Sequence, residues 1–423
     1  MANGMLPQSA RESVVVLPVL VVGSGLAGLA MALALDAQGV AVRLVGPNIG
    51  AQDAARDTRS TALFGRSLDF LARTQVLDRL VSAPVPLVGL RLVDATGSLF
   101  RAPEVLFKSS EISVDQFGMN IENGPLLRAL AERVLEAPGI EWIGDTVRSI
   151  ETCEAGASVA LASGETLDAR LVIGADGERS LCRLAAGVGE RTWTYPQVAI
   201  ASRFAHRRPH GCVSTELHRR AGPLTTVPLA GDWSSLVWVD TPEEARRRME
   251  LGERAFAAEL EAELGGILGG VTEVGARASF PLSGVTAERL GARRIALVGE
   301  AGHRLPPIGA QGLNLGLRDV AWLADLVADA ISFDEDPGGV KLLEAYDRAR
   351  RGDVAMRTAV VDSLNMSLLA GLLPVDMVRG AGLAALKTIG PLRRFFMREG
   401  MGPGGELPRL MQPVAERDGS SPN

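Results

Sequence analysis

The sequence predicts an α/β fold in which short buried strands alternate with helices, and three stretches of the chain carry that prediction. Residues 17–22 form an apolar run that leads through the glycine-rich segment 23–28 into an alanine- and leucine-rich stretch. Residues 171–173 and 295–298 are two further apolar runs, and each ends in a glycine-bearing turn. Continuous apolar runs of this length are typical of strands that are buried on both faces of a parallel sheet.

The segment 23–28 reads GSGLAG, which matches the G-x-G-x-x-G pattern of dinucleotide-binding turns. A strand precedes it and a helix to about residue 38 follows it, which is the context that the pattern requires. Gly23 makes the tight turn, Gly25 admits a pyrophosphate, and Gly28 lets the helix pack on the strand. We therefore predict a Rossmann-like domain that begins here.

The end of the next strand departs from the usual pattern of such domains. Residues 40–45 are expected to form that strand, and an acidic residue usually follows it to hold the ribose of the dinucleotide. This chain has Gly46 there, followed by Pro47 and Asn48. The ribose is therefore expected to be held either by the backbone and Asn48 or by a side chain from later in the sequence.

Composition sets broad limits on the class of protein. At 423 residues with 47% hydrophobic residues, the chain is long enough for two or three domains with a large core. Its net charge of -6 argues against general nucleic-acid binding. Three widely spaced cysteines without a C-x-x-C pair predict a reducing, cytoplasmic setting and no disulfide framework. No metal site is expected, because the spacing of His206, His210, Cys212 and His218 matches no familiar ligand set.

Residues 14–35 contain no charged residue, which by length alone would suit a transmembrane helix. The glycines at 23, 25 and 28 divide the stretch into a strand and a helix, so we do not predict a membrane span. Residues 1–13 lack the basic start and small-residue cleavage site of a signal peptide, and we expect them to be a disordered lead.

Residues 293–320 read RRIALVGEAGHRLPPIGAQGLNLGLRDV and predict a strand, a long glycine- and proline-rich loop and the start of a helix. Such a loop makes a cradle for an anionic or planar ligand, because glycines permit close approach and the first amides of the helix point outward. Glu300, at the end of the strand, can accept a hydrogen bond from a sugar or ribityl hydroxyl.

The remaining glycine-bearing turn is GADG at residues 174–177, with Ser180 and Arg183 behind it in the pattern G-A-D-G-x-x-S-x-x-R. This pattern resembles the second motif of the FAD-dependent aromatic-hydroxylase monooxygenases, and residues 293–320 resemble their third flavin-contacting motif. Residues 303–316, HRLPPIGAQGLNLG, are similar more narrowly to the signature of the ubiquinone-biosynthesis hydroxylases. The wider superfamily usually has aspartate where this chain has glutamate after Gly299, and the substitution keeps the carboxylate.

The resemblance implies that FAD is the cofactor and that the loop residues Pro306, Pro307, Gly309 and Gln311 lie against the isoalloxazine ring. No catalytic side chain is expected, since the flavin carries the chemistry. The full set of cofactor-binding residues that we expect is Gly23, Gly25, Gly28, Arg59, Asn123, Arg128, Asp176, Gly177, Glu300, Gly309, Gly312, Leu313 and Asn314.

Some of these contacts have an alternative interpretation. Arg59 matches a family arginine near the flavin phosphates, but it could instead face solvent. Family members have a further contact near the start of the helix expected after residue 121, for which Asn123 and Arg128 are the candidates. Asn123 could instead only cap that helix. Asp176 could belong to an ordinary turn, although Ser180 and Arg183 favour the motif.

Because the three motifs are scattered along the chain, the FAD-binding domain is expected to be assembled from discontinuous segments. An inserted antiparallel β-sheet is expected to cover the substrate, and helices are expected to follow at the C-terminal end. The predicted division is 14–84, 119–190 and 283–330 for the FAD-binding domain, 85–118 and 191–282 for the substrate domain, 331–412 for the C-terminal helical region and 413–423 for a disordered tail.

Local patterns predict several further features. Residues 57–80 suit one helix that Thr58 or Ser60 caps, and residues 243–264 suit one charged surface helix. The tail 369–410 mixes apolar and basic residues, so it could lie on a membrane, bind a partner or close the core. A basic cluster forms either a solvated face or a contact with membrane phosphates, and its members are Arg207, Arg208, Arg219 and Arg220.

The resemblance implies an FAD-dependent monooxygenase of ubiquinone biosynthesis that hydroxylates the aromatic ring of a polyprenylated phenol. In that chemistry O2 forms a C4a-hydroperoxide on the reduced flavin, and an electrophilic OH passes to the ring. The chain shows no second G-x-G-x-x-G after a strand, so NAD(P)H or another reductant is expected to approach the flavin transiently. An apolar channel between the sheet and the flavin is expected to take the prenyl chain. The setting is expected to be cytoplasmic, with peripheral contact to the inner membrane face or to a biosynthetic complex left open.

Two other functions fit parts of the pattern. One is a different flavin enzyme on the same fold, such as a halogenase or a prenyl reductase, although Trp233 and Trp238 lack the W-x-W-x-I-P spacing of flavin halogenases. The other is a non-catalytic FAD-binding subunit of a biosynthetic complex. The sequence does not specify an oligomeric state.

Overall fold

The computed structural model describes residues 19–50, 57, 59–80, 84–97, 102–369, 373–402 and 405–413, without the side chains of residues 373–379. The expected lead at 1–13, Thr58 and positions 414–423 of the expected tail lie outside these residues. Among the described residues, no helix combines the length and the apolar character needed to cross a membrane.

A six-stranded sheet forms the first layer, in the order β19-β20-β12-β1-β2-β8, and every pairing from β20 to β8 is parallel. Both neighbours of β1 are therefore parallel to it, as the buried apolar runs predicted. The strands are β1 (Val19–Val22), β2 (Val42–Val45), β8 (Ile140–Ile143), β12 (Leu171–Gly174), β19 (Gly291–Ala292) and β20 (Ile295–Leu297).

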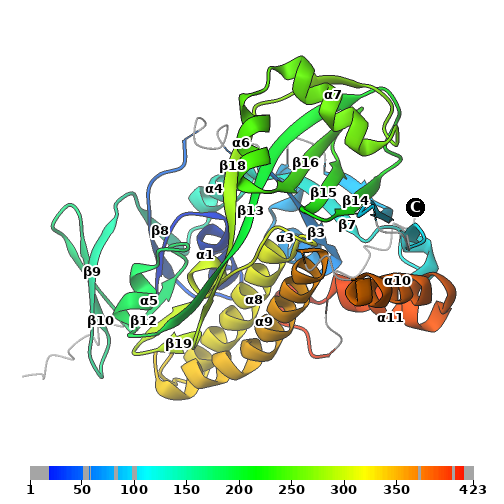
Figure 1. Cartoon of the computed structure of the whole chain (residues 1–423). Coiled ribbons are helices and arrows are strands. Elements are labelled where there is room, and N and C mark those ends of the chain that lie inside the picture. The colour runs from blue at the N-terminus through cyan, green and yellow to red at the C-terminus, as the bar shows by residue number, and fades with distance from the viewer. Residues whose placement is uncertain are drawn as a thin grey trace, which may run out of the picture.

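Helices cover one face of this sheet and a small sheet covers the other (Figure 1). The helices are α1 (Leu26–Asp36), α4 (Asn123–Glu136), α8 (Gln311–Ser332) and α9 (Val340–Leu369). The opposite face packs against β9 (Val147–Thr152), β10 (Ala157–Leu161), β11 (Thr166–Ala169) and α5 (Leu181–Ala185). These layers confirm the predicted Rossmann-like α/β domain.

The second large sheet has the order β21-β18-β13-β16-β15-β14-β5-β6, with β17 paired to β13. All of its pairings are antiparallel except β14 with β5. Segments on both sides of the second flavin motif thus share one sheet. The strands are β5 (Gly89–Asp94), β6 (Val105–Lys108), β13 (Glu190–His206), β14 (Val213–Arg219), β15 (Gly222–Pro228), β16 (Trp233–Asp240), β17 (Val271–Val274), β18 (Ala278–Ala287) and β21 (His303–Arg304).

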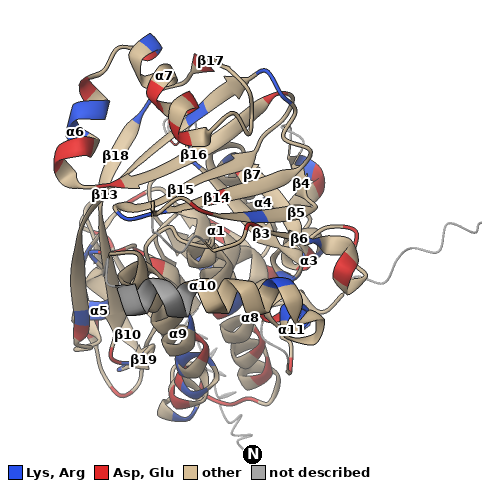
Figure 2. Ribbon diagram, turned by 45° about the vertical axis from the view of Figure 1, so that its right-hand side comes forward, with Lys and Arg blue, Asp and Glu red and all other residues tan. Residues whose placement is uncertain are grey.

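One face of the second sheet is covered by two helices rather than by the single helix predicted for 243–264. These helices are α6 (Pro242–Glu250) and α7 (Glu253–Leu264), and they carry charged side chains of both signs (Figure 2). The helix is interrupted because Leu251 and Gly252 both have extended backbone conformations. Gly252 then serves as the N-cap of α7, a position that glycine tolerates well.

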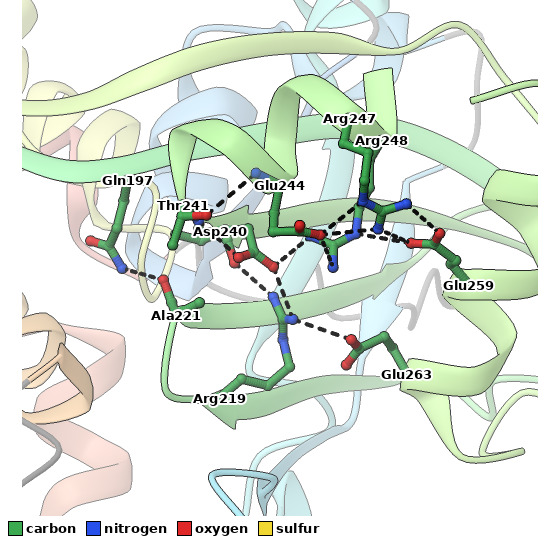
Figure 3. A network of polar contacts seen from close by, with 11 residues as sticks. Gln197, Arg219, Ala221, Asp240, Thr241, Glu244, Arg247, Arg248, Glu259 and Glu263 are labelled. Atoms are coloured by element: carbon green, nitrogen blue, oxygen red, sulfur yellow. Dashed lines mark hydrogen bonds and ion pairs between the residues drawn. The ribbon is translucent and has the colours of Figure 1, made fainter. Parts of the chain in front are cut away.

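The predicted basic cluster is wrong for Arg219, because this residue belongs to a group of buried ion pairs between the second sheet and α6 (Figure 3). Arg219 is only 8% exposed and does not belong to a solvated basic face. Its guanidinium lies 3.2 Å from a carboxylate oxygen of Asp240, and Arg248 of α6 contacts the same oxygen at 2.5 Å. Both guanidinium groups also stack on Trp238, at 5.5 and 4.3 Å from the ring centroid. The two charges are buried because each is paired.

Residues 57–80 do not form the single helix that the local pattern predicted. Ser60 lies in β3 (Ser60–Phe64), which pairs with β7 (Gly118–Glu122), and α3 (Gly65–Arg73) begins only after this strand. The pairing partner lies far away in sequence, and helix propensity does not report such a long-range contact.

The small sheet is completed by β4 (Val85–Leu87). The short 3-10 helices are η1 (Leu77–Arg79), η2 (Ser109–Ile112), η3 (Gly299–Ala301) and η4 (Arg409–Met411).

The C-terminal helices α10 (Leu373–Thr388) and α11 (Gly390–Met401) partly close the core. Leu383 and Met397 are buried against Phe107 of β6. Phe395 and Phe396 of α11 are 59% and 52% exposed. Closing the core therefore accounts for one face of these helices, and contact with a membrane or a partner stays a prediction for the other.

Candidate functional site

Three glycine-bearing turns meet at one edge of the parallel sheet. They follow β1, β12 and β20, which are neighbouring parallel strands, so their carboxyl ends lie side by side. A Cβ atom on Gly23 would overlap the backbone of Ala175, and one on Gly299 would lie 3.0 Å from Ala27. The three motifs are therefore one contiguous site at the carboxyl edge, which is where α/β sheets bind their ligands.

The first turn is shaped by backbone crowding. Gly23 has a φ of +108°, a conformation that favours glycine, and a Cβ on Gly28 would overlap the carbonyl oxygen of Gly23. Gly25 differs, because no atom lies within 4 Å of its Cβ position. Two of the glycines are thus required by packing, and Gly25 leaves open space at the start of α1 for a phosphate.

The same turn explains why no acidic residue follows β2. A Cβ on Gly46 would lie 2.6 Å from the amide nitrogen and 2.7 Å from the hydroxyl of Ser24. Ser24 in turn donates a hydrogen bond to the carbonyl of Pro47 at 2.7 Å. A carboxylate side chain has no room there, and Asn48, which is exposed beside Gly144, is the nearest polar side chain that follows.

The second turn is held by its own polar side chains. The carboxylate of Asp176 accepts hydrogen bonds from the hydroxyl of Ser180 at 2.6 Å and from the amide of Cys182 at 3.0 Å. Arg183 donates to the carbonyl of Ala301 at 2.8 Å and therefore ties this turn to the third one. Gly177, with a φ of +78°, has open space at its Cβ position. Ser180 and Arg183 thus support the turn, and the open space at Gly177 leaves its backbone accessible to a ligand.

The third turn is anchored by a buried ionic network that the sequence analysis did not identify. Asp319 of α8 is fully buried and accepts hydrogen bonds from the amide of Gly299 at 3.2 Å and from Arg350 at 2.8 Å. Nε2 of His303 lies 2.5 Å from the same carboxylate. Burial by itself raises the pKa of Asp319, but the charges and hydrogen bonds of His303 and Arg350 outweigh it and hold the pKa below 3.8. The only signal in the sequence was an aspartate within an apolar helix.

Arg59, Asn123 and Glu300 are brought together beside these turns. The guanidinium of Arg59 donates to the carboxylate of Asp57 at 2.7 and 2.8 Å. That hydrogen bond raises the pKa of Arg59, burial lowers it, and the charges of Asp57 and Glu300 raise it further, so Glu300 lies within electrostatic range. The amide group of Asn123 donates to Asp57 at 3.2 Å and accepts from Thr61 at 2.7 Å. The site therefore offers both a cation and a carboxylate.

The loop before α8 presents backbone rather than side chains. Pro306 is buried, whereas Pro307, Gly309 and Gly312 are exposed, and Gln311 is half-buried. The amides of the first turn of α8, which includes Leu313, have no partner within the helix. They can therefore stabilise negative charge on a ligand at this end of α8.

Asn314 is occupied by the protein itself. Its amide nitrogen donates to the carbonyls of Ala62 and Ala310 at 2.8 and 2.7 Å. Its oxygen accepts from the amide of Phe64 at 3.0 Å and from the hydroxyl of Ser67 at 2.7 Å. Any contact of Asn314 with the cofactor must therefore use its backbone.

Arg59 and Arg128 are both candidates for a cofactor contact, and they lie in different surroundings. Arg128 is exposed on α4, outside the group formed by Asp57, Arg59, Asn123 and Glu300. Replacing Arg59 with glutamine is expected to weaken FAD binding by about 1.5–3 kcal/mol, the value of a charge-assisted hydrogen bond, or about tenfold to a hundredfold. Isothermal titration of the apoprotein with FAD measures this change.

The control is the replacement of Arg128 with glutamine, which is expected to leave FAD affinity unchanged. Neither substitution is expected to alter the melting temperature much, because an exposed ion pair contributes little to stability. If only the Arg128 variant lost affinity, the contact would belong to α4 and the role given to Arg59 would be wrong.

Comparison with known proteins agrees with this geometry. Residues 16–362 match the family described as FAD binding domain. The chain is 36% identical over 419 residues to "Ubiquinone hydroxylase UbiL" of Rhodospirillum rubrum, covering 98% of this chain and 96% of that protein. It is 28% identical over 389 residues to "3-demethoxyubiquinol 3-hydroxylase" of Escherichia coli, covering 91% of this chain and 98% of that protein.

The fold is shared with solved structures at lower identity. The p-nitrophenol 4-monooxygenase PnpA of Pseudomonas putida DLL-E4 superposes with a TM-score of 0.72 at 20% sequence identity. The alignment covers 91% of this chain and 98% of that one, so both the parallel sheet and the second sheet belong to the common architecture.

Proposed function

This chain belongs to the FAD binding domain family together with the ubiquinone hydroxylases, and from this we propose that it hydroxylates the aromatic ring of a polyprenylated phenol in ubiquinone biosynthesis. The observation that carries the proposal is 36% identity to a ubiquinone hydroxylase over 98% of this chain, a span that contains the glycine turns that meet at the sheet edge. The match extends over both sheets, so it covers more than a shared cofactor domain.

The residues at the sheet edge fit a bound FAD. Gly25 and Gly177 both have open space where a Cβ would stand, so a pyrophosphate can approach the backbone of the first two turns. Arg59 supplies a positive charge for the phosphates, and Glu300 supplies an acceptor for a ribityl hydroxyl. The start of α8 supplies unpaired amides for the ring.

When bound and reduced, FAD supplies the activation of O2 from which one oxygen atom reaches the phenol ring. The chain's own tasks are to hold the flavin, orient the phenol and exclude water. We expect the loop from Pro306 to Gly312 to lie against the isoalloxazine ring and the first amides of α8 to favour negative charge there. Electrons come from NAD(P)H or another reductant that binds transiently, and O2 is the co-substrate.

Incubating the FAD-loaded protein with a 2-prenylphenol, NAD(P)H and 18O2 is expected to yield a catechol or hydroquinone that carries one 18O on the ring. Mass spectrometry of the product measures the label, and 16O2 with H2 18O serves as the control, for which no label is expected. Transfer of an oxygen atom from O2 distinguishes a monooxygenase from a halogenase or a prenyl reductase.

An unlabelled ring in a reaction that consumes NAD(P)H and the phenol would contradict the proposal and favour another flavin enzyme of this fold. If the protein were a non-catalytic subunit, a variant that does not bind FAD would restore quinone synthesis in a strain that lacks this protein. Complementation by the wild type but not by that variant would exclude the structural role.

A further inference from the structure

The second sheet holds a buried histidine–glutamate pair that the flavin site does not use. Glu216 and His218 lie on β14 and are 6% and 4% exposed. Nε2 of His218 lies 2.7 Å from a carboxylate oxygen of Glu216. Neighbouring residues of the sheet flank Glu216 in register, with Thr225 of β15 on one side and Leu92 of β5 on the other.

The pair lies on the face of the sheet that is turned toward the flavin site. Ser60, the residue after Arg59, donates a hydrogen bond to Ser235 of β16 at 2.8 Å, which places Ser235 on that face. Val237 is two residues further along the strand and lies on the same face. Val237 pairs with Thr225, and Thr225 pairs with Glu216, so all three side chains point to one side.

The side chains that alternate with Glu216 and His218 point to the opposite face of the second sheet. Leu217 and Trp238 belong to the apolar cluster beneath α6 and α7. Figure 3 shows the same side of the sheet, where Arg219 reaches toward Asp240 and Glu263. The alternation along β14 thus puts Glu216 and His218 opposite the structural ion pairs, on the face that meets Ser60.

One ring nitrogen of His218 has no hydrogen-bond partner among the described residues. Because Nε2 faces a carboxylate, the neutral ring carries its hydrogen on Nε2 and leaves a lone pair on Nδ1. Nδ1 is buried, and in the described part of the chain no group lies within hydrogen-bonding distance of it. Buried polar atoms are nearly always paired, so an unpartnered acceptor here points to a ligand that donates a hydrogen bond.

We propose that His218 and Glu216 bind the ring hydroxyl of the substrate and that Nδ1 takes its proton. The O–H bond of the phenol breaks, an N–H bond forms on Nδ1, and the electron pair stays on the phenolate oxygen. Glu216 stabilises the imidazolium that results. A phenolate directs an electrophilic oxygen to its ortho and para carbons more strongly than a phenol does. This inference rests on the proposed function, because it assigns the substrate's hydroxyl to a place in that site.

Apolar clusters on both sides of the pair suit the rest of such a substrate. Ala199, Val237 and Val239 belong to one cluster on β13 and β16, and Leu90 and Leu92 belong to another on β5. Val237 of the first cluster and Leu90 and Leu92 of the second are only half-buried, so each cluster has surface that a ring with a prenyl chain can contact while its hydroxyl reaches His218.

The test is the ultraviolet difference spectrum of 2-prenylphenol bound to the FAD-loaded protein at neutral pH. A free phenol is neutral under these conditions, since phenols have a pKa of about 10. The wild type is expected to show the phenolate band, and His218→Gln is expected to lose it. The kcat for hydroxylation is expected to fall about a hundredfold or more in His218→Gln, with a smaller change in KM. The kcat of Glu216→Gln is expected to lie between those of the wild type and His218→Gln.

The matched control is His206→Gln. His206 is also buried in this sheet, but both of its ring nitrogens have partners, the carbonyl of Arg208 at 2.9 Å and the hydroxyl of Ser234 at 3.0 Å. Its spectrum and kcat are expected to match the wild type. FAD content and circular dichroism verify that each variant is folded, and Glu216→Gln tests the pair if His218→Gln does not fold.

Two results would overturn the inference. The wild type could bind the phenol in its neutral form, or His218→Gln could keep the phenolate band and the wild-type kcat. In either case 18O labelling of the ring by the wild type would leave the proposed function intact. Failure of the wild type both to bind prenylphenol and to label it would overturn the proposed function as well.

Discussion

Replacing Gly28 with alanine is expected to disrupt the first glycine turn, release FAD and lower the free energy of unfolding by about 3 kcal/mol. The added Cβ would overlap the carbonyl oxygen of Gly23, and a backbone atom cannot move aside as the end of a side chain can. At roughly 2 °C per kcal/mol, the melting temperature is expected to fall by about 6 °C. Differential scanning calorimetry of the apoprotein and the flavin content of the purified variant measure the two effects.

Alanine at Gly25 is the informative control, because the two glycines serve different purposes. Gly25 has a φ of -75°, which alanine adopts without strain, and nothing lies within 4 Å of its Cβ position. The melting temperature of the apoprotein is therefore expected to stay unchanged, while FAD affinity falls by about tenfold to a hundredfold, or about 1.4–2.8 kcal/mol. Equal loss of stability in both variants would contradict this division of roles.

Replacing Asp319 with asparagine is expected to lower the free energy of unfolding by about 3–5 kcal/mol. The substitution removes the charge that faces Arg350 and His303, and it leaves the buried guanidinium of Arg350 with less compensation. The amide of Gly299 depends on the same carboxylate, so the third turn is expected to loosen and FAD affinity to fall. Urea unfolding and FAD titration measure the two changes.

Asp319 also determines how the free energy of unfolding is expected to depend on pH. The folded-state pKa of Asp319 lies below its ordinary value of 3.8, so its contribution is fully present above 3.8 and is lost as the pH falls through the lower folded value. The difference between the wild type and the Asp319 variant is therefore expected to be constant at neutral pH and to shrink below 3.8.

Asp329→Asn on the same helix provides the control for charge removal. Its carboxylate pairs with Arg409 but is 53% exposed, so the expected cost is at most about 1 kcal/mol. A similar loss of stability in both variants would show that burial of the Asp319 network is not the cause.

The parallel sheet and its glycine turns were readable from the sequence, because their signals are local. Continuous apolar runs identified β1, β12 and β20, and the residues just after each run identified the turns. The roles of Gly23, Gly25 and Gly28 also followed from the motif, but the atoms that enforce them did not, since these include the backbone of Ala175, far along the chain. The same holds for Gly46, where the hydroxyl of Ser24 leaves no space for a carboxylate.

The sequence by itself therefore determined the fold class, the FAD-binding motifs and their strand–turn–helix context. Only the tertiary structure decided that Ser60 lies in a strand, that Arg219 is buried, and that His218 and Glu216 share the flavin-facing side of a sheet. The physical reason is that strand pairing and ion pairing join residues distant in sequence. Their energies depend on distance, register and burial, which local composition does not contain.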